Sequence, residues 1–174
     1  MENDIRDIFN RITERFDVPV RIGSRCETNT YYRIEDLSSK DIELCAEFLA
    51  ERIENVCSPN LPEILITLPG SYTGLTEELA KRLSVESSPL PMIDLEDVHL
   101  ENGNAGIVKN KRIMLINDVI TTARSCLEAH TKVTIAHASV LCWVALVDRT
   151  FGPGPVPVIS AFTGDPVLLL EELP

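Results

Sequence analysis

Short apolar runs alternate with segments of helical periodicity along the chain, and this alternation constrains the fold more than any other feature. The apolar runs are Glu63–Leu68 (EILITL), Lys111–Ile116 (KRIMLI) and Ala138–Val147. Helical spacing of apolar residues follows the first two runs, over Leu75–Leu83 and Cys126–Lys132. Short buried strands that alternate with helices are typical of βαβ units, whose strands run parallel. The pattern therefore predicts an α/β fold with a mostly parallel central sheet covered by helices on both faces.

The N-terminal segment gives a second set of predictions. Apolar residues at helical spacing predict an amphipathic helix over residues 1–16. Residues 17–37 show no long period and are predicted to be a loop or a small cap. Ser38 followed by Asp41 resembles a capping box, and the apolar spacing after it predicts a long helix.

Two other stretches flank the predicted core. Residues 84–110 contain two prolines and a polar, acidic run without a period, which predicts a surface loop with two short edge segments. The tail contributes two more short strand-like pieces, Val156–Ala161 and Val167–Leu170.

Length and charge limit the number of domains and the classes of partner. A chain of 174 residues is expected to form one domain, residues 1–174, because single cores serve chains of roughly 100–200 residues.

Its 27 acidic residues outnumber its 16 lysines and arginines, which gives a formal net charge of -11. Proteins that bind nucleic acids or anionic membranes need an excess of cations. The composition therefore argues against both classes of partner.

The five cysteines indicate the compartment. They are scattered, and the sequence has neither a CxxC pair nor a Cys/His metal spacing. Such cysteines are predicted to be buried thiols in a reducing cytosol. No apolar stretch reaches the roughly 20 residues of a membrane span, and residues 1–20 are too acidic for a secretory signal. A cytoplasmic location is expected.

The residues that follow each apolar run deserve the closest inspection, because ligands of such sheets bind beyond the carboxyl ends of the strands. Residues 113–125 (IMLINDVITTARS) place Asp118 after a strand and three hydroxyl residues, Thr121, Thr122 and Ser125, before a helix. An acid at a strand end can accept hydrogen bonds from sugar hydroxyls, and free N–H groups with hydroxyls at a helix start can hold a phosphate. The alternative is that the hydroxyls only cap the helix.

This stretch resembles a known family. A strand, two acidic residues, two apolar residues and a threonine-rich turn form the ribosyl-pyrophosphate-binding motif of type I phosphoribosyltransferases. Three further stretches are similar, in the right order, to the orotate phosphoribosyltransferase branch: residues 22–39 (IGSRCETNTYYRIEDLSS), 68–75 (LPGSYTGL) and 146–149 (LVDR). The resemblance implies the type I phosphoribosyltransferase fold, with a small hood drawn from the N-terminal and C-terminal segments.

The resemblance also implies a reaction and its site. A Mg²⁺-dependent enzyme of this kind transfers phosphoribosyl from phosphoribosyl pyrophosphate to a pyrimidine base, here orotate, and Asp118 would be the catalytic residue that holds the ribose hydroxyls. The implied substrate-binding residues around it are Asn117, Thr121, Thr122, Ala123, Arg124 and Ser125 for the 5′-phosphate end, Ser71, Tyr72, Thr73 and Gly74 for pyrophosphate, and Tyr31, Tyr32 and Arg149 for the base. The resemblance implies a homodimer, with a phosphoribosyl compound and a pyrimidine base as its small-molecule partners.

The sequence departs from the family pattern at four places. Asn117 replaces the first of the two motif acids, and Ala123 or Arg124 replaces a glycine of the phosphate loop. Thr73 stands where the orotate branch commonly has a lysine. The branch also carries a loop rich in lysine and arginine, whereas residues 94–108 here contain four acids, a histidine (His99) and no lysine or arginine.

These departures leave two hypotheses open. One is an orotate-phosphoribosyltransferase-like enzyme with a degenerate cationic loop. The other is a non-catalytic protein of the same fold that binds a phosphoribosyl compound or nucleotide for regulation, because loss of cations from a transition-state clamp slows chemistry steeply.

Overall fold

A computed structural model describes residues 1–22, 26–89, 105–150 and 152–169. Its central sheet has five strands in the order β4-β3-β5-β6-β7, and every neighbouring pair is parallel. The strands are β3 (Ile64–Thr67), β4 (Glu86–Pro89), β5 (Arg112–Ile120), β6 (Ser139–Asp148) and β7 (Val158–Thr163). The predicted parallel sheet is therefore confirmed.

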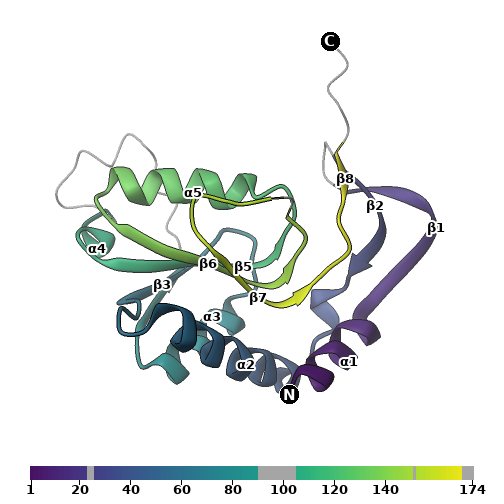
Figure 1. Cartoon of the computed structure of the whole chain (residues 1–174), viewed down its shortest axis with the longest axis horizontal. Helices are drawn as coiled ribbons and strands as arrows, with labels where there is room; N and C mark the ends of the chain where they lie inside the picture. The colour runs from purple at the N-terminus through teal and green to yellow at the C-terminus, as the bar shows by residue number, and fades with distance from the viewer. Residues whose placement is uncertain (23–25, 90–104, 151, 170–174) are drawn as a thin grey trace, which may run out of the picture.

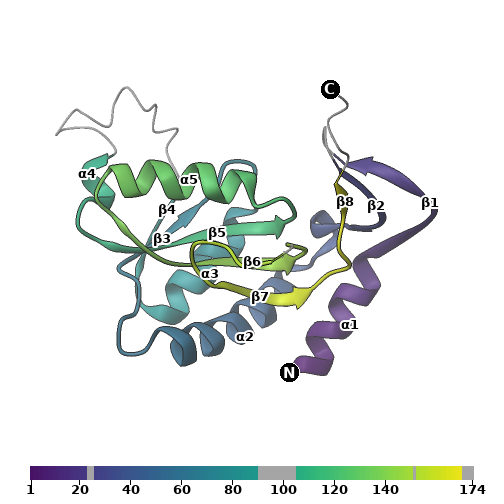
Figure 2. The same cartoon turned by 45° about the horizontal axis from the view of Figure 1, so that its top comes forward.

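Helices cover both faces of this sheet (Figure 1). They are α1 (Glu2–Ile12), α2 (Ser39–Cys57), α3 (Thr73–Leu83), α4 (Ala105–Val108) and α5 (Arg124–Ile135), and a 3-10 turn, η1, spans Ile34–Asp36. Helices α2 and α3 lie on one face and α5 lies on the other (Figures 1 and 2). The helices on both faces were predicted from the alternation of the sequence, and the structure confirms them.

Alternation of side chains along the strands builds the two halves of the core. On β5, Met114 and Ile116 pack with α2 and α3, whereas Ile113 and Leu115 join the cluster below α5. Trp143 of β6 is 1% exposed and belongs to the α5 side. Because both faces are buried, the strands read in the sequence as continuous apolar runs.

Helix α2 begins at the predicted capping box. The Ser38 hydroxyl accepts a hydrogen bond from the Asp41 amide at 3.2 Å, and the Asp41 carboxylate accepts one from the Ser38 amide at 2.9 Å. This reciprocal pair satisfies two N–H groups that the helix itself leaves free.

A second, antiparallel sheet forms the hood. It contains β1 (Thr13–Ile22), β2 (Cys26–Tyr32) and β8 (Leu168–Leu169) in the order β1-β2-β8. Figures 1 and 2 show the hood standing beside the end of the central sheet, above α1. The hood thus combines the N-terminal and C-terminal segments, as the resemblance implied.

The structure corrects one prediction for the N-terminal segment and adds detail to another. Helix α1 ends at Ile12, so Phe16 belongs to β1 rather than to the predicted helix over residues 1–16. Most of residues 17–37, predicted as a loop or cap, form the β1–β2 hairpin of the hood. The hairpin escaped prediction because β1 shows no strict alternation of buried and exposed residues.

Two other predictions concern the cysteine thiols and the loop of residues 84–110. Of the five cysteines, all free, Cys57 is partly exposed and the other four are buried. Residues 84–110 supply the edge strand β4 and the short helix α4, while the acidic stretch with His99 lies largely outside the described residues. Within the described ranges, no helix is both long enough and apolar enough to span a membrane.

Leu49 offers a direct test of the core on the α2 side. Its side chain is 0% exposed, so Leu49→Ala should lower the free energy of unfolding by about 2–5 kcal/mol through lost burial and a residual cavity. Urea denaturation measures this change. Val56→Ala is the control on the same helix, because Val56 is 58% exposed and should change stability by less than about 0.5 kcal/mol. Equal effects of the two substitutions would contradict the assigned packing.

Candidate functional site

The predicted site residues gather at the carboxyl ends of β3, β5 and β6. Three segments follow these strands: the turn of residues 68–72 before α3, the loop of residues 121–123 before α5, and Asp148 with Arg149. Parallel order brings these three segments to the same edge of the sheet, where ligands of such folds bind.

Asn117 connects two of these segments. Its side-chain oxygen accepts hydrogen bonds from the Ser71 hydroxyl at 2.8 Å and from the Asp118 amide at 2.9 Å. Its amide nitrogen donates to the Cys126 thiol sulfur, 3.8 Å away. A carboxylate at position 117 has no N–H to donate to that sulfur. The departure from the two-acid motif therefore gives the site a bridging amide between the turn, β5 and α5.

Asp118 is a partly buried carboxylate at the centre of this edge. It accepts a hydrogen bond from the Val119 amide at 2.8 Å. Burial raises the pKa of Asp118, while the backbone N–H groups of Val119, Asp118 and Tyr72 counteract part of that rise. A desolvated carboxylate that costs stability is typical of a functional position.

A small hollow of about 40 Å³ lies where β5 turns into α5. It is lined by Asn117 and residues 119–126. Ala123 precedes α5 with φ 58° and ψ 4°, a left-handed conformation that favours glycine. The structure thus identifies Ala123, rather than Arg124, as the residue in the glycine-like conformation. The Arg124 side chain is exposed and pairs with Glu128 at 2.8 Å.

The turn before α3 holds the residues predicted for pyrophosphate. Gly70 has φ 83°, and Tyr72 precedes the first helical residue, Thr73. The Tyr72 ring lies over Gly74, since a Cβ added there would be 2.5 Å from the ring. The Thr67 hydroxyl donates to Thr76 at 2.7 Å and fixes the start of α3 against β3.

A pocket of about 280 Å³ lies between the hood and the sheet edge, and we call it the hood pocket. The residues that line it are Ile22, Tyr31, Tyr32, Ile34, Glu35, Asp118, Val119, Thr121 and Arg149. Four of the predicted residues thus meet here with Asp118: both tyrosines, Thr121 and Arg149. Four lining residues were not predicted from the sequence: Ile22, Ile34 and Glu35, which no periodicity marks, and Val119, an apolar residue near the end of β5.

Arg149 has a structural task in this wall. It is 3% exposed. Its Nε donates to the Asp165 carbonyl at 2.6 Å, Nη1 donates to the Thr30 carbonyl at 3.2 Å, and Nη2 donates to the hydroxyls of Thr28 and Thr30. Its guanidinium carbon lies 5.3 Å from the centroid of the Tyr32 ring. Burial lowers the pKa of Arg149, and Tyr32 and Asp165 oppose that change.

The two tyrosines differ in environment. Tyr31 is 41% exposed, whereas Tyr32 is 5% exposed and accepts a hydrogen bond from the Asp165 amide at 3.0 Å. The exposed ring of Tyr31 has a free face for a planar ligand, while Tyr32 packs against Arg149 and Phe162.

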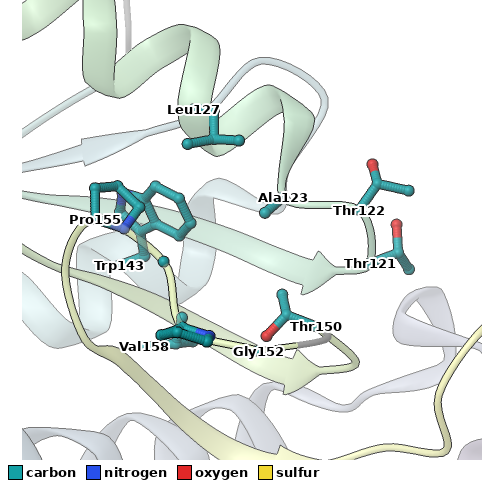
Figure 3. Close-up of a pocket in the computed structure, with 11 residues that line it drawn as sticks. Thr121, Thr122, Ala123, Leu127, Trp143, Thr150, Gly152, Pro155 and Val158 are labelled. Carbon is teal, nitrogen blue, oxygen red and sulfur yellow. The ribbon is translucent and has the colours of Figure 1, made fainter.

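A further pocket, of about 250 Å³, lies on the other side of the 121–123 loop (Figure 3). Trp143, Leu127 and Val158 make its apolar walls, and none of the described residues that line it is charged. In Figure 3 the side chains of Thr121 and Thr122 point away from these apolar walls. The two hydroxyls are therefore not committed to this apolar pocket.

Solved structures of other proteins share the fold of this chain. No family model and no curated protein matches the chain. Orotate phosphoribosyltransferase from Aeropyrum pernix has a TM-score of 0.65 at 16% identity, over 91% of this chain and 93% of that chain. Adenine phosphoribosyltransferase from Leishmania tarentolae has a TM-score of 0.66 at 15% identity, over 91% and 87%. UMP synthase from Leishmania donovani has a TM-score of 0.67 at 16% identity, over 92% of this chain and 36% of that chain. The chain has the type I phosphoribosyltransferase fold.

Asp118→Asn tests the cost of the buried carboxylate. Because burial raises the pKa of Asp118 in the folded state, the folded protein keeps this proton to higher pH than the unfolded chain. Stability from this group is full below the unfolded pKa and is lost as pH rises through the folded pKa. The variant should therefore unfold at higher denaturant than the wild type at neutral pH, and the difference should shrink in acid. Denaturation between about pH 3 and pH 8 measures it. Asp7→Asn, at an exposed position of α1, is the control. A lower stability of Asp118→Asn than of the wild type at neutral pH would contradict the assignment.

Arg149→Lys tests the attachment of the hood. Lysine cannot reproduce the planar set of donors, so buried acceptors on Thr28 and Thr30 lose their partners, and the free energy of unfolding should fall by about 3 kcal/mol. Arg52→Lys is a matched control, because Arg52 also lies over a ring, 5.4 Å from that of Phe48, but is exposed. It should change stability by less than about 0.5 kcal/mol. A similar response of both variants to urea would refute the structural task of Arg149.

Proposed function

We propose that this protein binds phosphoribosyl pyrophosphate with Mg²⁺ and transfers the phosphoribosyl group to a pyrimidine base. The observation that carries the proposal is the arrangement around Asp118, which lines the hood pocket, while its chain neighbours Asn117 and Val119 line the small hollow. Thr121 lines both spaces. The arrangement suits one ligand whose phosphate, sugar and base occupy adjoining spaces.

Each part of that ligand has proposed partners. The 5′-phosphate would lie in the hollow, near the free N–H groups at the start of α5 and the hydroxyls of Thr121, Thr122 and Ser125. Asp118 would accept hydrogen bonds from the ribose hydroxyls. The turn of residues 70–74 would hold pyrophosphate, and the exposed ring of Tyr31 would lie against the base.

In the proposed transfer, the bond from ribose C1 to the pyrophosphate oxygen breaks and a bond from C1 to a base nitrogen forms. The electron pair leaves with pyrophosphate, and the base nitrogen releases its proton to solvent. Positive charge develops on the ribose in between, and the nearby Asp118 carboxylate would stabilise it because the site is partly shielded from water.

The residues fit a Mg²⁺ ion that arrives with its substrate. Within the described ranges, no group of three His, Cys, Asp or Glu side chains is arranged to hold a metal. Magnesium commonly binds through one or two carboxylates together with substrate phosphates and water. Asp118 would supply the protein carboxylate, and the ion would neutralise charge on pyrophosphate.

A second candidate is a non-catalytic protein that binds the same phosphoribosyl compound for regulation. The observation that favours it is the shortage of cations at the pyrophosphate end. Thr73 stands in place of lysine, residues 94–108 contain no lysine or arginine, and the Arg124 side chain pairs with Glu128. A homodimer is proposed in either case, since a second subunit can bring cations to such a site.

Calorimetry with phosphoribosyl pyrophosphate and Mg²⁺ tests both candidates, followed by an assay of base-dependent pyrophosphate release. Binding with release supports the enzyme, binding without release supports the regulatory protein, and no binding rejects both.

Thr121→Val tests the phosphate end. Loss of a hydroxyl that contacts a charged phosphate should weaken binding of ribose 5-phosphate about tenfold, as measured by calorimetry. Thr131→Val is the control, because the Thr131 hydroxyl donates to the Leu127 carbonyl on exposed α5. An unchanged affinity in Thr121→Val would remove the hollow from the proposal.

A further inference from the structure

We propose that the hood pocket selects an uncharged pyrimidine that presents N–H donors, such as uracil or cytosine, and disfavours a carboxylated pyrimidine such as orotate. This inference rests on the proposed function, because it assigns the base to the hood pocket. It concerns the charge of the groups that line that pocket.

The guanidinium of Arg149, in the wall of the hood pocket, already donates most of its hydrogen bonds within the protein. An arginine has five N–H donors, and four of those of Arg149 are donated to the Asp165 carbonyl, the Thr30 carbonyl and the two threonine hydroxyls. All four acceptors belong to the hood sheet or to the chain that leads into it. A base carboxylate would find at most one N–H on this guanidinium, too few for the bidentate contact that makes arginine a strong carboxylate partner.

The guanidinium also has little room to turn toward a ligand. A Cβ added at Gly164 would lie 2.7 Å from the Tyr32 hydroxyl and 3.0 Å from Cγ of Arg149. Gly164 itself donates its amide to the Asp148 carbonyl at 2.8 Å. The arginine is thus enclosed by Tyr32 on one side and by the β7–β8 connection on another, and reorientation would leave buried acceptors without donors.

The other charges in the pocket are negative. Among the residues that line it, Glu35 and Asp118 are acids, and Arg149 is the only cation in the described part of the chain that does so. Arg33, next to this wall, directs its Nε toward Glu14 at 3.3 Å and Asp36 at 4.0 Å. With Asp118 committed to the ribose, a carboxylate on the base would meet the Glu35 carboxylate, whereas a ring N–H or an amino group would find an acceptor there.

Orotate and uracil differ only by the carboxylate on C6, so they form a matched pair of ligands. We expect the wild-type protein to bind uracil about tenfold more tightly than orotate, given the size of like-charge repulsion near a protein surface. Cytosine, which carries an amino group in place of the C4 carbonyl of uracil, should bind at least as tightly as uracil. Calorimetry on the full chain, with and without saturating ribose 5-phosphate, measures the three affinities.

Glu35→Lys provides the charge test within the pocket. It should shift the ratio of orotate to uracil affinity toward orotate by about tenfold, because one repulsive charge becomes attractive. Glu51→Lys makes the same charge change on the exposed surface of α2, outside the residues that line the pocket, and should leave the ratio within about twofold.

Three results would overturn the inference: orotate binding as tightly as uracil in the wild type, no binding of either uracil or cytosine, or equal ratios in the two lysine variants. These results are distinguishable from failure of the proposed function, because in that case the protein would not bind phosphoribosyl pyrophosphate. The base affinities measured without ribose 5-phosphate still decide the selectivity in that case.

Discussion

The buried residue Arg149 joins the central sheet to the hood sheet, two sheets that have no strand in common. Its backbone amide donates to the Ile120 carbonyl at the end of β5, while its side chain donates to Thr28 and Thr30 of β2 and to the Asp165 carbonyl. The hood sheet is small, and β8 contributes only two residues. Such a sheet has little core of its own, so the bonds of this cation help to fix its position beside the end of the central sheet.

At the edge of the sheet that forms the site, some polar side chains are hydrogen-bonded within the protein, while Asp118 is held at a cost in stability. Asn117 and Ser71 are satisfied by each other, and Asn117 also contacts Cys126. Asp118, in contrast, is held where burial raises its pKa. A sugar-binding position requires a carboxylate that is held in place and shielded from water. The hydrogen-bonded neighbours of Asp118 keep it in place, and its partial burial strengthens the hydrogen bonds it makes.

The sequence predicts the central sheet well and the hood poorly, for a physical reason. Strands β3, β5 and β6 are buried on both faces, so their composition alone marks them. Strand β1 is mostly exposed and contains Pro19, and it gains its structure by pairing with β2. The site shows the same division: the motif places Asp118 and Thr121 at a strand end, but it does not indicate that the donors of Arg149 are taken by Thr28 and Thr30. Those bonds join residues more than a hundred positions apart.

Thr121 belongs to the wall of both the hollow and the hood pocket. A ligand in the hollow and a ligand in the hood pocket would both contact Thr121, so binding of one can change the free energy of binding of the other. Linkage then makes the effect mutual: whatever factor the sugar phosphate adds to the affinity for the base, the base adds to the affinity for the sugar phosphate. A single residue at the boundary therefore gives this fold a route to cooperative binding of the two ligands without a change in the position of any helix or strand.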